Sequence, residues 1–269
     1  MYYLTACAVV KNEAPYLREW LEYHIIQGVE HFYIYNNVST DETEGILKEY
    51  QYHGYVTYDT MPEVPIQFKA YNRCLKEHGA RSHWMMFTDI DEFIAVKDHT
   101  EFASKLHKYE EHPGLALHWA GFGSNGQMTQ QPGLVIERFT KRCAGPNLHV
   151  KSLVQPALTI SVGKDPHTFY YKVGQAVDEH FRKLPKDYAI WNPKPCADNI
   201  WLNHYWVKSK EEFIARRKNP NAGDGRPYGD MNETFKAQDV NEVEDLTAQY
   251  WAEAVKRMIK YRGNQYGIY

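Results

Sequence analysis

Three acidic residues lie within four positions of this 269-residue chain, directly after an apolar run: Asp89, Asp91 and Glu92 follow residues 84–88. Carboxylates packed this closely repel one another and lose hydration unless a cation or hydrogen bonds compensate. Asp89 and Asp91 project to the same side of an extended segment, while Ile90 points to the core. Such a pair suits Mn²⁺ or Mg²⁺, with coordination positions left for water and a diphosphate. A helix-capping turn is the alternative interpretation of the motif.

The elements before and around this motif alternate between strand and helix. Apolar runs of strand length alternate with helical patterns, the strands at 4–10, 31–37, 55–58, 84–88 and 93–96, the helices at 15–25, 39–50 and 68–78. This alternation predicts an α/β fold with a mainly parallel sheet covered by helices on both faces. Ligands of such sheets bind outside the carboxyl ends of the strands. We therefore expect Lys11–Glu13, Asn36–Asp41 and Asp89–Glu92 to meet at one edge.

The pattern after residue 100 is weaker. We expect a helix over 101–111, strands at 115–119, 134–139, 149–154 and 200–207, and a final helix over 243–261. Ser39–Glu42 and Ser209–Glu212 each have the spacing of a capping box, which predicts that a helix begins there. The Gly- and Pro-rich residues 219–229 indicate a loop.

Composition excludes several classes of protein. With 31 Lys and Arg against 34 Asp and Glu, the net charge is −3, which argues against a nucleic-acid binder. No apolar run approaches the roughly 20 residues of a membrane span, and the first residues do not resemble a secretory signal. The four cysteines show no paired ligand spacing, which predicts free thiols in a reducing compartment. We therefore expect a cytoplasmic globular protein.

Several further segments stand in a characteristic order along the chain. They are Val9–Glu13, Glu19–His24, Gly28–Asn37, Asp89–Phe93, Trp119–Gly126, Lys151–Pro156, His167, Asn203–Tyr205 and Lys208–Ser209. Together they resemble glycosyltransferase family 92 and its bacterial relatives, which are GT-A glycosyltransferases. The likeness runs from about residue 4 to residue 218 and does not reach the last fifty residues.

The resemblance implies a function and an architecture. The function is a metal-dependent, inverting transfer of a hexose, often galactose, from a UDP-sugar to a glycan hydroxyl. The architecture is a GT-A fold in one continuous domain: residues 1–98 bind the donor, 99–218 bind the acceptor and carry catalysis, and 219–269 add a loop and a helix. The expected setting is synthesis of surface polysaccharide or lipopolysaccharide at the inner face of the membrane, with a glycan or lipid-linked acceptor.

A metal site of this kind needs one or more carboxylates and often a histidine. We expect Asp91 to be the most direct ligand and Asp89 to face the metal or the ribose. The resemblance offers His204 and His167 as the ligand from the second half of the chain. A lone histidine is more often a structural residue, so both interpretations stay open.

The donor nucleotide is expected over the ends of the first two strands. The residues predicted to bind it there are Lys11, Asn12, Glu13 and Asp41. The alternative for Asp41 and its neighbours Ser39 and Glu42 is helix capping alone. The resemblance implies that Lys69 and Asn72 also bind the donor.

Lys151 is a single lysine in an apolar strand, so it needs an anionic partner, and we expect that partner to be a phosphate of the donor. The alternative is an exposed strand end.

Inversion by a single displacement requires a base that takes the proton of the acceptor hydroxyl. Asp178 and Glu179 lie in a polar stretch of the second half and are our candidates, with Glu137 as a third that the sequence cannot separate from them. Trp119 and Phe122 are expected to hold the acceptor, since aromatic faces pack against sugars. Trp119 is as readily a core residue. Asn221–Tyr228 is a candidate lid over the donor.

Two other functions compete with this interpretation. A sugar-phosphate nucleotidylyltransferase would need a glycine-rich basic loop after the first strand, and Lys11–Pro15 contains no glycine. A carbohydrate-binding module without catalysis would leave the acidic triplet as an unexplained electrostatic cost.

Overall fold

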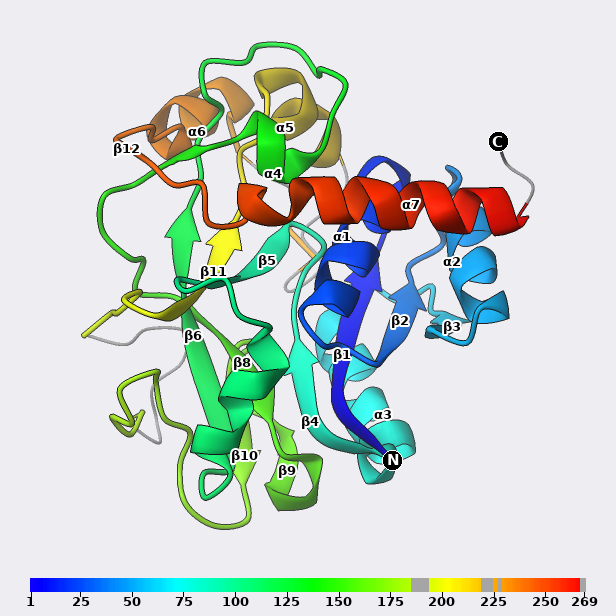
Figure 1. Cartoon of the computed structure of the whole chain (residues 1–269), viewed down its shortest axis with the longest axis vertical. Coiled ribbons are helices and arrows are strands. Elements are labelled where there is room, and N and C mark those ends of the chain that lie inside the picture. The colour runs from blue at the N-terminus through cyan, green and yellow to red at the C-terminus, as the bar shows by residue number, and fades with distance from the viewer. Residues whose placement is uncertain (185–193, 219–224, 227–228, 267–269) are drawn as a thin grey trace.

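The structure is a computed structural model that describes residues 1–184, 194–218, 225–226 and 229–266. Its centre is one mixed sheet with the strand order β3-β2-β1-β4-β8-β6-β11-β5 (Figure 1). The first four strands of the chain are mutually parallel: β1 (Tyr2–Val10), β2 (His31–Asn36), β3 (Val56–Thr60) and β4 (Ser82–Phe87). The predicted α/β class with a mostly parallel sheet is confirmed.

Both faces of this parallel region are covered. The helices that follow its strands are α1 (Ala14–Ile26), α2 (Thr43–Tyr52) and α3 (Gln67–His78). Alternate residues of β1 point to opposite faces: Leu4 and Val10 share a core with Trp20 of α1, while Cys7 shares another with Tyr71 of α3. The burial of both faces explains why these strands read as nearly continuous apolar runs.

The other half of the sheet is mixed. Its strands are β5 (Glu92–Val96), β6 (Gly114–Gly121), β8 (Val150–Val154) and β11 (Ile200–His204). β8 runs antiparallel to both β4 and β6, and β11 lies between β6, its parallel neighbour, and β5, its antiparallel neighbour. The chain therefore crosses from β4 in the middle of the sheet to β5 at its edge, and Asp89–Asp91 make that crossing.

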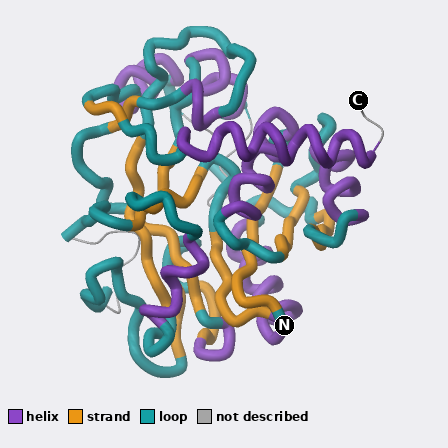
Figure 2. The backbone as a smooth tube through the Cα atoms, viewed as in Figure 1, coloured by secondary structure: helices purple, strands orange, loops and turns teal. Residues whose placement is uncertain are grey.

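Smaller elements complete the structure. They are β7 (Lys141–Arg142), β9 (Thr159–Val162), β10 (Phe169–Tyr171), β12 (Val243–Glu244), and the 3-10 turns η1 (Gly79–Arg81), η2 (Phe102–Tyr109), η3 (Pro156–Leu158) and η4 (Gln249–Trp251). The later helices are α4 (Val135–Arg138), α5 (Lys210–Arg216), α6 (Met231–Gln238) and α7 (Ala252–Tyr266). In Figure 2 the strands run through the middle of the molecule.

The last helix returns to the first half of the chain. In Figure 1, α7 lies across α1, and its Val255 is part of the same core as Trp20. The buried Arg262 of α7 pairs with Glu22 of α1. The final segment is thus packed onto the predicted donor-binding half rather than standing apart from it.

Two local predictions, a strand and a helix cap, are wrong because residues distant in the sequence bond to these segments. Residues 134–139 form no strand, because the carboxylate of Glu19 accepts the N–H groups of Val135 (2.7 Å) and Ile136 (3.0 Å) and so begins the short helix α4. Ser39 caps no helix, since its Oγ accepts the N–H of Asn12 (2.9 Å). In contrast, the capping box of Ser209 at the start of α5 is confirmed.

Two other boundaries differ from the pattern. The predicted helix over 101–111 is the 3-10 segment η2, and the predicted helix over 243–261 begins only at Ala252. All four cysteines are free thiols. Within the described ranges, no helix is both long and apolar enough to cross a bilayer.

Candidate functional site

The three polar segments predicted to meet do meet, at the carboxyl ends of β2, β1 and β4. Lys11 Nζ donates to Asn37 Oδ1 (3.2 Å), and Asn12 Oδ1 accepts the N–H of Thr40 (2.7 Å). These bonds join the loops after β1 and β2. Asp41 accepts N–H groups at the starts of α1 and α2, from Ala14 (3.1 Å) and Thr43 (3.0 Å), so its capping role is present in the structure.

Asp91 lies at the centre of this edge and is 1% exposed. Its Oδ2 pairs with Arg216 and lies 3.6 Å from His204 Nε2. Its Oδ1 is buried and accepts no hydrogen bond from any residue that the structure describes. Burial acts to raise the pKa of Asp91, but Arg216 and His204 outweigh it and hold the pKa well below its usual range. The carboxylate is therefore ionised and retains an unused oxygen.

The register of β11 positions His204 beside Asp91. His204 is paired with Glu92 in the antiparallel ladder, and the N–H of Tyr205 donates to the carbonyl of Asp91 (2.8 Å). The register of the sheet edge thus fixes the imidazole beside the carboxylate. Of the two predicted histidine ligands, His204 is the one in contact with Asp91. His167 instead faces a backbone carbonyl, that of Val150, at 3.0 Å from Nδ1.

Two cationic side chains near Asp91 come from the segment after β11. Arg216, the last residue of α5, reaches Asp91 and also lies with Nε 3.7 Å from Glu13 Oε1. Lys208 is buried and has Nζ 4.5 Å from the centre of the Tyr16 ring. Burial lowers the pKa of Lys208, with Asp91 and Glu13 acting in the opposite direction. We call Glu13, Asp91, His204, Lys208 and Arg216 the Asp91 corner.

Asp89 and Glu92 face a different cation. Lys151 Nζ is buried 2.8 Å from Asp89 and 3.7 Å from Glu92, and Gln67 Nε2 donates to the other oxygen of Asp89 (2.8 Å). Lys151 was predicted to need an anion, and in the structure Asp89 supplies one; the predicted contact with a donor phosphate stays a prediction. Burial raises the pKa of Glu92 to about 7 against the effect of Lys151.

Trp119 of β6 joins the histidines near this corner. Its ring lies 4.2 Å from that of His204, 5.0 Å from that of His149 in a stack, and 5.4 Å from that of His167. Trp119 is half-buried, so part of its side chain stays accessible. Phe122 differs, since it is 2% exposed and packs on Tyr205 in the core, so its predicted contact with an acceptor is wrong.

The model of glycosyltransferase family 92 matches residues 3–192. The chain belongs to glycosyltransferase family 92. A family 92 protein of Oryza sativa subsp. japonica is 32% identical over 178 residues, 64% of this chain and 30% of that protein. One of Ricinus communis is 25% identical over 232 residues, 80% of this chain and 37% of that protein.

Other likenesses are shorter or more distant. The galactan beta-1,4-galactosyltransferase of Arabidopsis thaliana is 31% identical over 111 residues, 38% of this chain and 21% of that enzyme. Among solved structures, TarS of S. aureus in complex with UDP shares 18% identity and a TM-score of 0.40, over 58% of this chain and 47% of that one. The family 92 chain spans about a third of the length of the first two curated relatives.

The predicted bases lie elsewhere in this family 92 chain. Glu179 accepts N–H groups from Asp198 (2.6 Å), Asn199 (2.8 Å) and Ile200 (3.0 Å), and so holds the start of β11. Asp178 is buried and pairs with Arg182 (2.6 Å). His204 is four residues beyond Ile200 along β11, which corresponds to about 13 Å at the rise per residue of a strand. The structure therefore does not bring Asp178 or Glu179 to the Asp91 corner.

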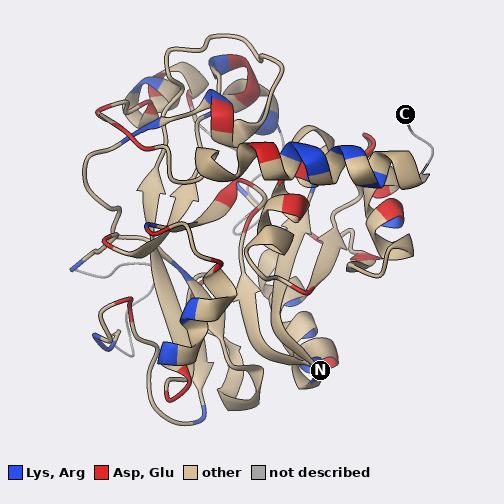
Figure 3. Cartoon of the chain, in the orientation of Figure 1, with Lys and Arg blue, Asp and Glu red and all other residues tan. Residues whose placement is uncertain are grey.

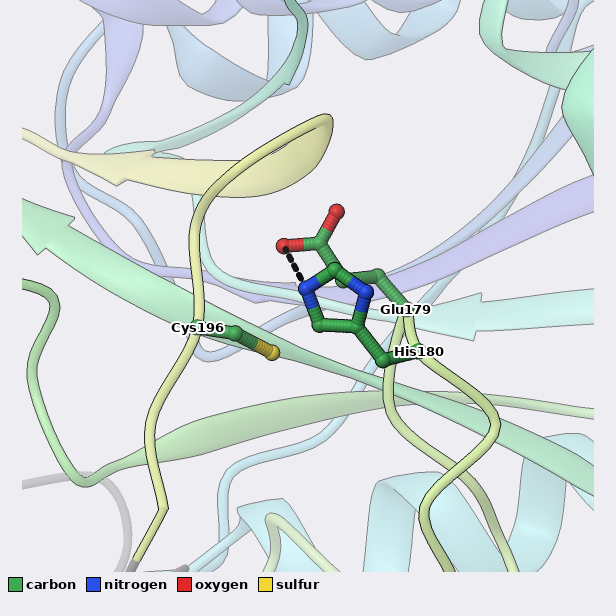
Figure 4. A group of neighbouring side chains, drawn as sticks. All are labelled: Glu179, His180 and Cys196. Atoms are coloured by element: carbon green, nitrogen blue, oxygen red, sulfur yellow. Dashed lines mark ion pairs between the residues drawn. The ribbon is translucent and has the colours of Figure 1, made fainter.

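Side chains of this second region also approach the arrangement of a metal site. Glu179, His180 and Cys196 place ligand atoms within 4.8 Å of one another (Figure 4). However, Glu179 already accepts three backbone N–H groups, and His180 Nε2 pairs with Asp198 (2.7 Å). We interpret these residues as a structural junction and call Asp178, Glu179, His180, Arg182 and Cys196 the β11 junction.

The remaining predicted donor residues lie on α3, facing away from Asp89. Gln67 and Tyr71 share the face of α3 that turns toward the sheet. Lys69 is exposed, and Asn72 Oδ1 accepts the N–H of Val162 (3.1 Å), which ties α3 to β9. The helix thus brings Gln67 to the site, not Lys69 or Asn72. Glu137 of α4, the third candidate base, pairs with Lys256 of α7 (2.6 Å). The predicted lid, 221–228, falls largely outside the described residues.

The donor atoms of the Asp91 corner fit a divalent cation. Asp91 offers an unbonded oxygen, and its other oxygen is 3.6 Å from an imidazole nitrogen, close to the spacing of two ligands on one ion. Carboxylate oxygen with imidazole nitrogen is a donor set that Mn²⁺ accepts. Asp89 is partly exposed nearby, held by Lys151 and Gln67. Sequence reasoning missed Arg216 and Gln67, since neither stands near the acidic motif in the chain.

Proposed function

We propose that this family 92 chain is a metal-dependent, inverting glycosyltransferase that moves a hexose from a UDP-sugar to a glycan hydroxyl. The observation that carries the proposal is Asp91: a buried, ionised carboxylate with an unused oxygen, beside an imidazole and two cations, at the carboxyl edge of a parallel sheet. Family membership supports the reaction class, and the galactan galactosyltransferase supports UDP-galactose as the first donor to test.

Asp91 and His204 would hold the cation in this mechanism. A bound divalent cation offsets the charge that grows on the diphosphate as the glycosidic bond breaks. Lys208 and Arg216 add positive charge on the same side, where the leaving group would lie. Lys11, Asn12 and Glu13 at the end of β1 lie where the nucleotide would pass, as expected for a ligand at the carboxyl edge.

The acceptor is proposed to reach the site over Trp119. Its half-buried ring is next to His204, so a sugar packed on it would lie near the anomeric carbon of the donor. The proposed setting is polysaccharide or lipopolysaccharide synthesis in the cytoplasm. Inversion is tested by the stereochemistry of the product: retention at the anomeric carbon would contradict it.

A thermal-shift screen tests the proposal directly. The chain is melted with UDP-, GDP- and CMP-sugars, each with and without Mn²⁺, because stabilisation grows with occupancy. We expect a rise in melting temperature for a UDP-sugar only when Mn²⁺ is present. A nucleotidylyltransferase would respond to a free nucleoside triphosphate, and a carbohydrate-binding module would respond to glycans without metal. Either result would contradict the proposal.

A further inference from the structure

Arg216 stands where a cation held jointly by Asp91 and His204 would lie. Its guanidinium pairs with Asp91 Oδ2, the same oxygen that faces His204 Nε2 at 3.6 Å. A divalent cation at that oxygen would repel the guanidinium, because like charges this close oppose each other. We propose that Arg216 is a diphosphate-binding residue that neutralises Asp91 while the donor is absent and transfers to the phosphates of the donor when a divalent cation takes its place. This inference rests on the proposed function and deepens it.

The way α5 is anchored permits this movement. At its first residues the helix is held by the Ser209 capping box and by Glu212, which receives two bonds from Arg138 (3.0 and 2.6 Å). Arg216 is at the other end, and its side chain is 34% exposed against 1% for Asp91. The guanidinium can therefore leave Asp91 by side-chain rotation while the helix stays in place.

Glu13 offers a second contact that survives the transfer. It follows β1 at the carboxyl edge of the sheet and lies 3.7 Å from Arg216 Nε, whereas Asp91 contacts the terminal nitrogen. When a cation occupies Asp91, the Nε side of the guanidinium remains beside Glu13. The terminal nitrogens are then available to a phosphate, which arginine binds through two parallel hydrogen bonds.

The charges of the Asp91 corner make the two ligands depend on each other. Without ligands, Glu13 and Asp91 are balanced by Arg216 and Lys208. A divalent ion alone would add two positive charges beside the two cationic side chains of the corner. A diphosphate supplies negative charge that offsets them. Metal alone is thus expected to bind weakly, and metal and nucleotide are expected to bind together.

The neighbouring arginine does not share this role. Arg217 is buried, and its guanidinium lies 3.4 Å from the centre of the Phe213 ring and 4.1 Å from that of Trp206. It therefore belongs to the packing of α5. Of the adjacent pair, Arg216 alone reaches the acids of the corner within the described residues.

The test measures two affinities whose changes have opposite signs. Arg216→Gln, Arg216→Lys and the wild type are titrated with Mn²⁺ alone, by the electron paramagnetic resonance signal of free Mn²⁺, and with UDP at saturating Mn²⁺, by calorimetry. Lys218→Gln is the matched control, since Lys218 is exposed two residues away and carries the same charge. Circular dichroism establishes that each variant is folded.

For Arg216→Gln we expect Mn²⁺ alone to bind several-fold tighter and UDP to bind about tenfold weaker. The tenfold loss of UDP affinity corresponds to one charge-assisted hydrogen bond. Arg216→Lys should lie between the two, and Lys218→Gln should match the wild type. Weaker UDP binding with unchanged Mn²⁺ affinity would overturn the exchange, and two unchanged affinities would overturn the whole inference. A wild type that binds no UDP at saturating Mn²⁺ would instead overturn the proposed function.

Discussion

Two acidic regions lie at opposite ends of β11, and they differ in how their oxygens are used. At the β11 junction, Glu179 accepts three backbone N–H groups and Asp178 pairs with Arg182. At the Asp91 corner, one buried oxygen of Asp91 accepts no bond from the described part of the chain. Figure 3 shows that charged residues are spread over many elements, so their presence alone marks neither region.

The difference separates acids that build the fold from acids available to a ligand. A buried carboxylate whose oxygens all accept backbone N–H groups stabilises one conformation of the chain. A buried carboxylate held by a partly exposed arginine can exchange that partner for another cation. We therefore expect substitutions at the junction to change stability, and substitutions at the corner to change ligand binding.

The largest expected effect is at Asp91. Asp91→Asn keeps the size of the side chain but removes the charge and one anionic oxygen, so the affinity for UDP at a fixed Mn²⁺ concentration should fall more than about 100-fold. Calorimetry measures this. The melting temperature should change little, because Arg216 is partly exposed and can turn to solvent. Mn²⁺-dependent binding that survives the substitution would remove Asp91 from the site.

Glu179→Gln should have the opposite profile. The amide group turns a donor toward backbone N–H groups that need an acceptor, which should lower the free energy of unfolding by about 2 kcal/mol. Urea denaturation measures this loss, while UDP binding at saturating Mn²⁺ should match the wild type. If the variant were as stable as the wild type and bound UDP but transferred no sugar, Glu179 would be the base after all.

Substitutions of two histidines test which imidazole belongs to the Asp91 corner. His204→Ala should weaken Mn²⁺ binding about tenfold, since it removes a nitrogen that faces Asp91. His167→Ala serves as the comparison, because its Nδ1 contacts the carbonyl of Val150 instead. We expect less than a twofold change for His167→Ala, measured by the same titration. A larger effect at His167 than at His204 would exchange the two assignments.

Local patterns predicted the parallel half of the sheet well and the site only in part. β1, β2 and β4 are apolar runs closed by polar loops, so the meeting of Lys11–Glu13 with Asp89–Glu92 followed from the rule for parallel strands. The crossing of the chain to β5 at the sheet edge did not follow, because it depends on β11, a hundred residues later. The contact of His204 with Asp91 has the same long-range origin.

The failures share this cause. Val135 and Ile136 favour a strand locally, and only the distant carboxylate of Glu19 makes them helical. Lys151 was correctly expected to need an anion, but the sequence could not say that Asp89 would supply it. Nothing near Arg216 in the sequence sets it apart from the other arginines, and only its contacts with Glu13 and Asp91 in the fold give it a role.

The smallest expected effect again separates the junction from the corner, now through pH. His118 lies beside the junction, with Nδ1 3.4 Å from the N–H nitrogen of Cys196, and burial lowers its pKa to about 4. Because the unfolded chain binds this proton more tightly, with a pKa near 6.5, stability is fully present above that pH and decreases as the pH falls toward 4.

We expect the free energy of unfolding to drop by about 1 kcal/mol more between pH 7.5 and 5.5 in the wild type than in His118→Asn, which keeps an acceptor near Nδ1. His24, with a pKa also lowered to about 4, makes the same contribution to the pH dependence of stability in both proteins. Glu19, with a pKa raised to about 7, contributes with the opposite sign, again equally in both. If the free energy of unfolding changed equally with pH in the two proteins, burial would not lower the pKa of His118 in the folded chain.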